Sequence, residues 1–171
     1  MKKNREMSMN IQLKPFTDSD LTLFVNWLHS ERIQRWYAPV EAWIDEVSKR
    51  ESEYSWIRHY IILAEETPIG FCQYYPYWRS GEDWQGSIPV EETYSIDYLI
   101  GEVDFLRKGC ACQALKLLQS LIFALPNGQR IIAQPDEDNL ASRQTLLAAG
   151  YTYDEENELF IIVRREDSHP L

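Results

Sequence analysis

The fold of this chain is decided by two neighbouring segments, Tyr94-Ser95-Ile96-Asp97-Tyr98-Leu99-Ile100 and Arg107-Lys108-Gly109-Cys110-Ala111-Cys112. The first is rich in β-branched and aromatic residues, which predicts a strand. The second is a basic turn of small residues, and it opens a helix because apolar side chains then recur on one face as far as residue 122. We therefore expect a strand, a basic turn and a helix in direct succession.

A basic turn of this kind is suited to hold phosphate. Successive backbone N–H groups point into the turn, and the helix dipole adds partial positive charge. Gly109 and Ala111 let the backbone approach a pyrophosphate closely, while Arg107 and Lys108 add full positive charges. Many helices begin with similar residues and bind nothing, so the turn alone leaves both interpretations open.

Outward from these segments, strands and helices alternate at short spacing. Helices are expected from about residue 21 to 28, from 40 to 47, and from Asn139, a good capping residue, to Gly150. Further strands are expected in five places, at residues 11–16, 59–64, 69–75, 130–134 and in a closing hairpin of 151–153 with 159–163. The order is βααβββαβαββ, which predicts one mixed α/β domain.

The charge balance argues against a nucleic-acid partner, and the hydropathy of the chain argues against a membrane partner. The chain has 17 basic and 27 acidic residues, a formal net charge of −10, which repels a nucleic-acid backbone and attracts small cations. No stretch approaches the roughly 20 apolar residues that span a bilayer, and residues 1–7 lead into no apolar signal core. We expect a soluble, cytoplasmic protein with neither a nucleic-acid nor a membrane partner.

Cysteine and histidine give little sign of a metal site. Cys72, Cys110 and Cys112 are odd in number, which favours cytosolic thiols over disulfides, and the three histidines lack metal-ligand spacing. We predict no metal. Beside Arg107 and Lys108, the pKa of the Cys110 and Cys112 thiols could be lowered. Both cysteines could equally be small residues that merely fit the turn.

Several further segments match one known family in identity and order. Along the chain they are Trp27-Leu28, Glu31-Arg32, Trp36-Tyr37, Pro68-Ile69-Gly70-Phe71, Gln73, Ile96-Asp97-Tyr98-Leu99-Ile100-Gly101, Lys108-Gly109 and Asn139-Leu140. With these matches the chain resembles the GCN5-related N-acetyltransferase (GNAT) superfamily, and within it the aminoglycoside 6′-N-acetyltransferase branch. The resemblance covers roughly residues 10 to 164.

The resemblance implies a fold and a co-substrate. The implied fold is a central, mostly antiparallel, twisted sheet flanked by helices, with residues 10–171 as a single acyl-CoA N-acyltransferase domain after a flexible segment 1–9. The implied co-substrate is acetyl-CoA, with its pyrophosphate in the basic turn. Its implied contacts are Leu99, Ile100, Arg107, Lys108, Gly109, Cys110, Ala111, Cys112 and Asn139. Backbone N–H groups around Leu99 and Ile100 would stabilise the tetrahedral oxyanion.

The resemblance also implies a reaction, transfer of an acetyl group to a primary amine of a small cationic acceptor, with aminoglycosides as the first candidates. A protonated amine has no lone pair, so the enzyme must bind a cation and then help it lose a proton. Asp97 matches an aspartate that binds substrate amines in this branch and is the expected catalytic residue. The implied acceptor contacts are Trp36, Tyr37, Gln73, Tyr75, Asp97 and Asp136.

An aromatic cluster borders the long polar loop between residues 76 and 93. It consists of Tyr74, Tyr75, Tyr77, Trp78 and Trp84. Because alternate residues of a strand must point inward, ordinary sheet packing explains these side chains as well as a substrate wall does.

Two positions depart from the family pattern near the expected substrates. Leu106 stands where the phosphate-binding turn usually begins with a polar residue, and Arg107 could compensate for it. Gln134 occupies the second acidic position of the aminoglycoside branch. Asp136 or Glu137 could supply the missing carboxylate.

A third departure concerns proton transfer. Leu146 aligns with the tyrosine that often protonates the leaving thiolate in the family. We expect slow but real turnover, unless a water or Tyr151 replaces this acid, because general-acid help is typically worth about a hundred- to ten-thousand-fold. One alternative is an acyl-CoA-binding sensor with little catalysis. Another is an N-acyltransferase for a siderophore intermediate, a polyamine or a protein N-terminus.

Overall fold

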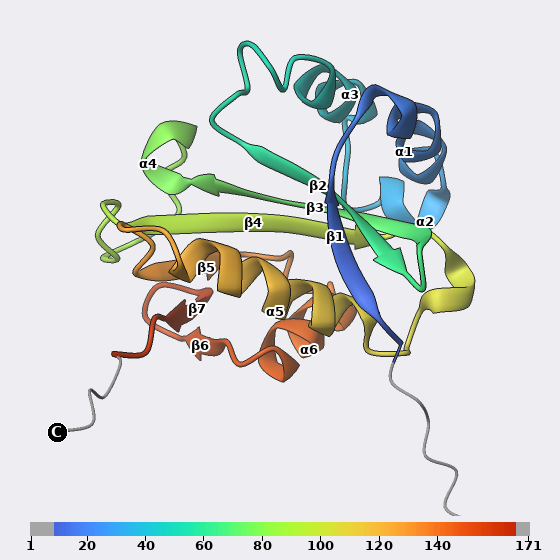
Figure 1. Cartoon of the computed structure of the whole chain (residues 1–171). Helices are drawn as coiled ribbons and strands as arrows, with labels where there is room; N and C mark the ends of the chain where they lie inside the picture. Colours follow the sequence, from blue (N-terminus) through green and yellow to red (C-terminus); the bar gives the residue numbers. More distant parts are fainter. Residues whose placement is uncertain (1–8, 167–171) are drawn as a thin grey trace, which may run out of the picture.

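The computed structural model describes residues 9–166 and contains one seven-stranded sheet with helices on both faces (Figure 1). The expected flexible segment 1–9 lies, apart from residue 9, outside the described residues. The strand order is β1-β2-β3-β4-β5-β7-β6, and every neighbouring pair is antiparallel except β4 and β5. The predicted mixed, mostly antiparallel sheet flanked by helices is confirmed.

The strands are β1 (Ile11–Pro15), β2 (Arg58–Ala64), β3 (Thr67–Pro76), β4 (Thr93–Ile100), β5 (Arg130–Ala133), β6 (Thr152–Asp154) and β7 (Leu159–Val163). The helices are α1 (Leu21–Leu28), α2 (Glu31–Gln34), α3 (Val40–Ser48), α4 (Tyr77–Ser80), α5 (Cys110–Phe123) and α6 (Leu140–Ala148), with 3-10 turns at Asp18–Asp20 and Val103–Phe105. The long elements follow the predicted order. Helices α2 and α4 were not predicted, since four residues are too few to show a helical period.

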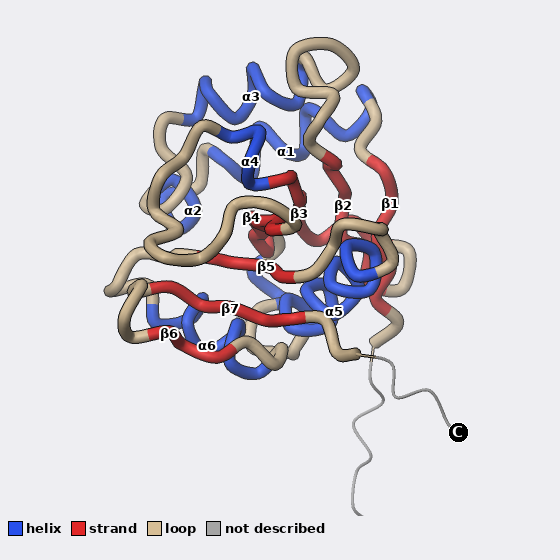
Figure 2. The backbone as a smooth tube through the Cα atoms, turned by 90° about the vertical axis from the view of Figure 1, so that its left-hand side faces the viewer, coloured by secondary structure: helices blue, strands red, loops and turns tan. Residues whose placement is uncertain are grey.

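The two faces of the sheet carry separate cores. Figure 2 shows α1 and α3 on one side of the strands and α5 on the other. Along β4, Ile96 and Ile100 face the core under α5, whereas Leu99 faces the core under α1 to α3. This alternation is the period of two that a strand requires. Within residues 9–166, no helix combines the length and the apolar character needed to cross a bilayer.

The sheet opens in its middle, between β4 and β5. These strands pair only from Thr93 to Ser95. Beyond Ser95 they separate, and the far end of β4 has no strand partner on that side. Side chains from α2 and the residues just after it, together called the α2 segment (residues 31–37), reach it instead. The Tyr37 hydroxyl donates a hydrogen bond to the Tyr98 carbonyl, and Arg32 Nη2 donates to the Ile100 carbonyl at 2.9 Å.

The opposite edge of β4 is packed too closely against β3 for any side chain at position 70. Gly70 pairs with Ile100, and a Cβ atom at Gly70 would lie 2.2 Å from the Leu99 carbonyl oxygen. Because that oxygen belongs to the backbone, it can move only if the two strands separate. Glycine at this position therefore keeps β4 in register.

Gly70→Ala is expected to lower the free energy of unfolding by about 1–3 kcal/mol, the usual cost of overpacking a core. Urea denaturation measures the change. Thr67→Ala, at an exposed position of the same strand, should stay within about 0.5 kcal/mol of the wild type. Equal stability of the two variants would contradict the close approach at Gly70.

Candidate active site

Two adjoining cavities lie where β4 and β5 separate. The acidic cavity, of about 270 Å³, is lined by Glu82, Asp97 and Asp136, and no Lys, Arg or His is found among its described lining residues. The basic cavity, of about 720 Å³, contains Arg32 and Arg107, and its described lining includes no Asp or Glu. Five residues line both cavities and mark their junction, Trp36, Tyr37, Tyr98, Asn139 and Ser142.

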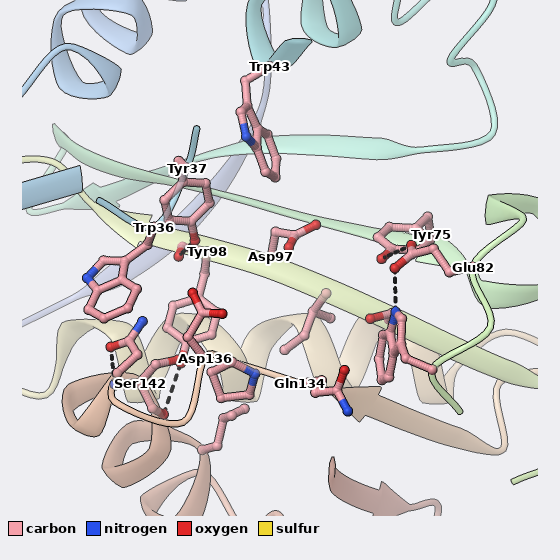
Figure 3. A pocket seen from close by; sticks show the side chains of 17 residues that line it. Trp36, Tyr37, Trp43, Tyr75, Glu82, Asp97, Tyr98, Gln134, Asp136 and Ser142 are labelled. Atoms are coloured by element: carbon pink, nitrogen blue, oxygen red, sulfur yellow. Dashed lines mark hydrogen bonds between the residues drawn. The ribbon is translucent and has the colours of Figure 1, made fainter. Parts of the chain in front are cut away.

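The Asp97 side chain lines the acidic cavity from the middle of the sheet, on β4 (Figure 3). Burial raises its pKa to about 7, against the effect of a hydrogen bond from Gln73 Nε2 to Asp97 Oδ2 at 2.9 Å. The negative charges of Glu46 and Glu82 raise the pKa further. A carboxyl with this pKa can both carry a charge and take up a proton near neutral pH.

A row of buried polar residues supports Asp97 from behind. His59 on β2, Gln73 on β3 and Asp97 on β4 are in-register neighbours, and His59 Nε2 lies 3.0 Å from Glu46 Oε1 on α3. Gln73 is only 2% exposed, and its Oε1 atom has no hydrogen-bond partner within residues 9–166. Gln73 lines neither cavity and holds the Asp97 carboxyl through its amide, so its direct contact with the acceptor stays a prediction.

Glu82, in the loop after α4, is a site residue that the sequence did not reveal. The Tyr75 hydroxyl donates to Glu82 Oε1 at 2.7 Å, and Trp84 Nε1 donates to the other carboxylate oxygen. The loop shows no periodicity, and only its aromatic residues gave a signal. Of the two carboxyls considered as substitutes at Gln134, Asp136 lines the cavity and Glu137 does not.

Aromatic side chains form the walls of the acidic cavity. They are Trp36, Tyr37, Trp43, Tyr75, Trp84 and Tyr98. Both interpretations of the aromatic cluster apply in part, because Tyr75 and Trp84 face the cavity while Tyr74 and Tyr77 pack in the cores. Trp43 was assigned only to the apolar face of its helix, and its edge-to-face contact with Tyr37, at 5.0 Å between ring centroids, brings it to the cavity.

The turn before α5 is shaped to receive an anion. Arg107 and Gly109 adopt left-handed backbone conformations, with φ of 59° and 75°. Within the described chain, the N–H groups of residues 107–109, 111 and 112 donate to no acceptor. A Cβ atom at Gly109 would meet nothing within 4 Å, so the space above the turn is open. Lys108 does not line the cavity, and its ammonium lies 5.6 Å from the centre of the Phe105 ring.

The structure corrects the expectation for Cys110. This residue is 1% exposed, and burial raises the pKa of its thiol although Lys108 acts in the other direction. The side chain belongs to the core under α5, so the position contributes its backbone to the turn. Cys112 is partly exposed and lines the basic cavity.

The main chain of β4 offers free groups at Ile100, as expected, and at Tyr98 in place of Leu99. The N–H and C=O groups of one strand residue point to the same side, and this side alternates along the strand. Tyr98 and Ile100 accept hydrogen bonds from α2-segment side chains on the side away from β3. Leu99 therefore directs its N–H toward β3, and the available donors are Tyr98 and Ile100.

The junction of the cavities is held by the first turns of α6. Asn139 caps the helix, with its Oδ1 atom accepting the Ser142 N–H at 3.2 Å. The Tyr98 hydroxyl lies 2.6 Å from Ser142 Oγ. Leu146, one turn later, lines the acidic cavity and carries no proton to donate. Tyr151 is 2% exposed, belongs to the core and lines neither cavity, so it cannot replace the missing acid.

No group of three His, Cys, Asp or Glu residues within the described range could hold a metal ion. The site as described therefore consists of carboxyls, aromatic rings and hydroxyls on one side of Tyr98. On the other side it consists of two guanidinium groups and free backbone N–H groups.

Comparison with known proteins agrees with this geometry. Residues 17–159 match the family described as acetyltransferase (GNAT) domain. Aminoglycoside N(6′)-acetyltransferase type 1 of Klebsiella pneumoniae and that of Serratia marcescens are each 26% identical over 152 residues, which cover 83% of this chain and 74% of theirs.

Among solved structures, AAC(6′)-Ib in complex with parmomycin and acetyl-CoA superposes with a TM-score of 0.77 at 22% identity, over 91% of this chain and 94% of that one. Aminoglycoside N(6′)-acetyltransferase from Legionella pneumophila superposes with a TM-score of 0.67 at 17% identity, over 94% and 95%. These two similarities establish the shared fold. Since the family match spans most of the chain, the protein belongs to the GNAT family of acetyltransferases.

Proposed function

We propose that this protein transfers an acetyl group from acetyl-CoA to a primary amine of a small cationic acceptor, with aminoglycosides as the first class to test. The observation that carries the proposal is the separation of charge between the two adjoining cavities. One holds three carboxyls and the other holds two guanidinium groups, and they meet at Tyr98. Such a pair suits one cationic and one polyanionic substrate whose reacting groups meet at the junction.

The relatives support both substrates. The curated relatives are named as aminoglycoside acetyltransferases, and AAC(6′)-Ib has been solved with acetyl-CoA and with coenzyme A. At 26% identity the acceptor of this chain can differ from theirs. The acceptor is therefore argued from the acidic cavity itself.

The basic cavity fits acetyl-CoA, which would supply a thioester carbonyl for attack by the amine. The backbone N–H groups of residues 107–109, 111 and 112 would hold the pyrophosphate, helped by the dipole of the 14-residue helix α5. Arg107 adds a full charge beside Leu106, where the family has a polar residue. The free N–H groups of Tyr98 and Ile100 would donate to the oxyanion.

Asp97 performs two tasks in this proposal. As a carboxylate it binds the ammonium group of the acceptor, together with the charges of Glu82 and Asp136. As a base it takes the proton that the amine must lose before its lone pair can attack. Aromatic walls limit the water around Asp97, which strengthens both interactions.

A thiol-release screen tests the proposal. The purified protein is incubated with acetyl-CoA and, in turn, aminoglycosides, polyamines, siderophore precursors and peptides with free N-termini, and products are identified by mass spectrometry. We expect turnover with at least one aminoglycoside. Turnover with another amine class alone would show that this class, and not the aminoglycosides, supplies the acceptor. Binding of coenzyme A without turnover on any amine would favour the sensor function, for which the leucine at position 146 is the specific observation.

Asp97→Asn is expected to lower turnover about a hundred- to ten-thousand-fold and leave the affinity for coenzyme A unchanged. The same variant should gain stability. The pKa of Asp97 is about 7 in the folded protein, against 3.8 for an unperturbed aspartate, so ionisation favours the unfolded chain increasingly from pH 4 to pH 7. The gain should be absent below pH 4 and reach a few kcal/mol above pH 7, at about 1.4 kcal/mol per pKa unit.

Thermal melts at pH 4, 6 and 8 measure this gain. Asp154→Asn is the matched control with the opposite sign. Hydrogen bonds from Asn157 lower the pKa of the Asp154 carboxyl, so its contribution is present at neutral pH and fades as the pH falls through its folded pKa. A melting temperature of Asp97→Asn that equals the wild type at pH 8 would contradict the assigned pKa.

Two nearly isosteric variants test the anion site. Asn and Asp both tolerate the left-handed conformation of Gly109 better than other side chains do, and they differ in charge. By calorimetry, Gly109→Asp should bind coenzyme A at least about tenfold more weakly than Gly109→Asn, because the carboxylate would stand beside the pyrophosphate. Equal affinities of the two variants for coenzyme A would show that the turn is not part of the binding site.

A further inference from the structure

Tyr98 places a hydroxyl group at the junction of the two cavities. It is the only residue of β4 that both cavities share, and its ring points from the sheet toward α6 (Figure 3). The hydroxyl donates a hydrogen bond to the Ser142 carbonyl oxygen at 3.2 Å and lies 2.6 Å from Ser142 Oγ. No step described so far uses this hydroxyl.

The Tyr98 hydroxyl lies where the hydroxyl of a tyrosine at position 146 would lie, because of the direction in which helical side chains point. A long side chain on a helix points back toward the N-terminus and covers the preceding turn. A tyrosine at position 146 would therefore bring its hydroxyl toward the turn that contains Ser142, four residues earlier. Tyr98 brings a hydroxyl to that same turn from the sheet, while position 146 holds a leucine that is fully buried.

We propose that Tyr98 Oη donates a hydrogen bond to the leaving sulfur atom during acyl transfer and takes the place of the tyrosine that position 146 lacks. This assignment rests on the proposed function. Tyr98 thereby contacts the reacting atoms and is a catalytic residue, although it comes from a strand and not from α6.

The bound ammonium first gives one proton to Asp97, which passes it to water. The amine lone pair then forms the N–C bond, the C–S bond breaks, and its electron pair remains on sulfur. The nitrogen releases its second proton to Asp97, which is again a carboxylate. The thiolate leaves as an acceptor of the Tyr98 O–H and then takes up one proton from solvent, so an ammonium and a thioester become an amide, a thiol and one released proton. Ser142 Oγ can donate its own proton to Tyr98 Oη. The Tyr98 O–H, which in the structure donates to the Ser142 carbonyl oxygen, then turns from that oxygen to the sulfur.

The pKa values of the Tyr98 hydroxyl and of the leaving thiol decide whether Tyr98 only donates a hydrogen bond or transfers its proton to the sulfur. Burial raises the pKa of Tyr98 to about 12, against the effect of Ser142, and the nearby Asp97 raises it as well. A thiol has a pKa of roughly 8.5, so the proton stays on the phenol. The other charged or titratable groups that line the two cavities are Arg32, Tyr37, Tyr75, Glu82, Arg107, Cys110, Cys112 and Asp136.

The first test measures binding without turnover. Calorimetry at pH 9 compares coenzyme A, which is then largely a thiolate, with desulfo-coenzyme A, which has no sulfur. A hydrogen bond to a charged group is worth about ten- to a hundred-fold in affinity, so the wild type should prefer coenzyme A by this factor. Tyr98→Phe should lose the preference. Tyr151→Phe, which removes a buried hydroxyl that lines neither cavity, should keep it.

The second test measures turnover on the best acceptor from the screen. Tyr98→Phe should lower kcat by about ten- to a hundred-fold, by the same amount at every pH between 6 and 9, because the hydroxyl does not titrate there. An acetyl thioester with a more acidic thiol should be affected less, since it needs less help to leave. Ser142→Ala should change kcat in the same direction by a smaller factor.

These outcomes separate the two proposals. A wild-type protein that binds no coenzyme A would overturn the proposed function. A protein that binds and turns over acetyl-CoA, with Tyr98→Phe retaining both kcat and the preference for coenzyme A, would overturn only the role of Tyr98. Should Tyr98→Phe fail to fold, unchanged sulfur preference and kcat in Ser142→Ala would count against the assignment.

Discussion

The early end of pairing between β4 and β5 is the constraint on which the rest of the structure depends. Three residue pairs join these strands, and past Ser95 the far end of β4 presents unpaired main-chain groups to the interior of the molecule. Unpaired backbone groups are costly unless something else satisfies them. Tyr37 and Arg32 cap two carbonyls from the α2 segment, and both cavities form in the space that β5 does not fill.

The charged groups are arranged at a cost to stability. Asp97 sits on a strand, in a row with His59 and Gln73 that interrupts the apolar core under α1 to α3, and its pKa near 7 means that the folded chain disfavours its ionised form. A core residue at this position would stabilise the sheet. Retaining a carboxyl there is typical of sites in which binding or catalysis requires a poorly solvated charge.

Much of the fold could be predicted because the residue patterns that specify each helix or strand lie within that element. The alternation of β4, the leucines of α5 and the cap at Asn139 all act within one element. In the candidate site, the residues alone pointed to the turn 107–112, which one segment supplies. Other cavity residues were named only through the family resemblance, and these are Trp36, Tyr37, Tyr75, Asp97 and Asp136. Glu82, Trp43 and the contact of Tyr98 with Ser142 depend on which elements meet in space. The burial of Gln73 and Cys110 likewise follows from packing, and no spacing in the sequence encodes it.

The side chains of Trp36 and Tyr37 belong to both cavities and come from one short connection after α2. In the proposed function, a ligand in the basic cavity that orders these two rings would lower the entropic cost that a ligand in the acidic cavity has to meet. By thermodynamic linkage the effect would be reciprocal, so acetyl-CoA and the acceptor amine would bind cooperatively.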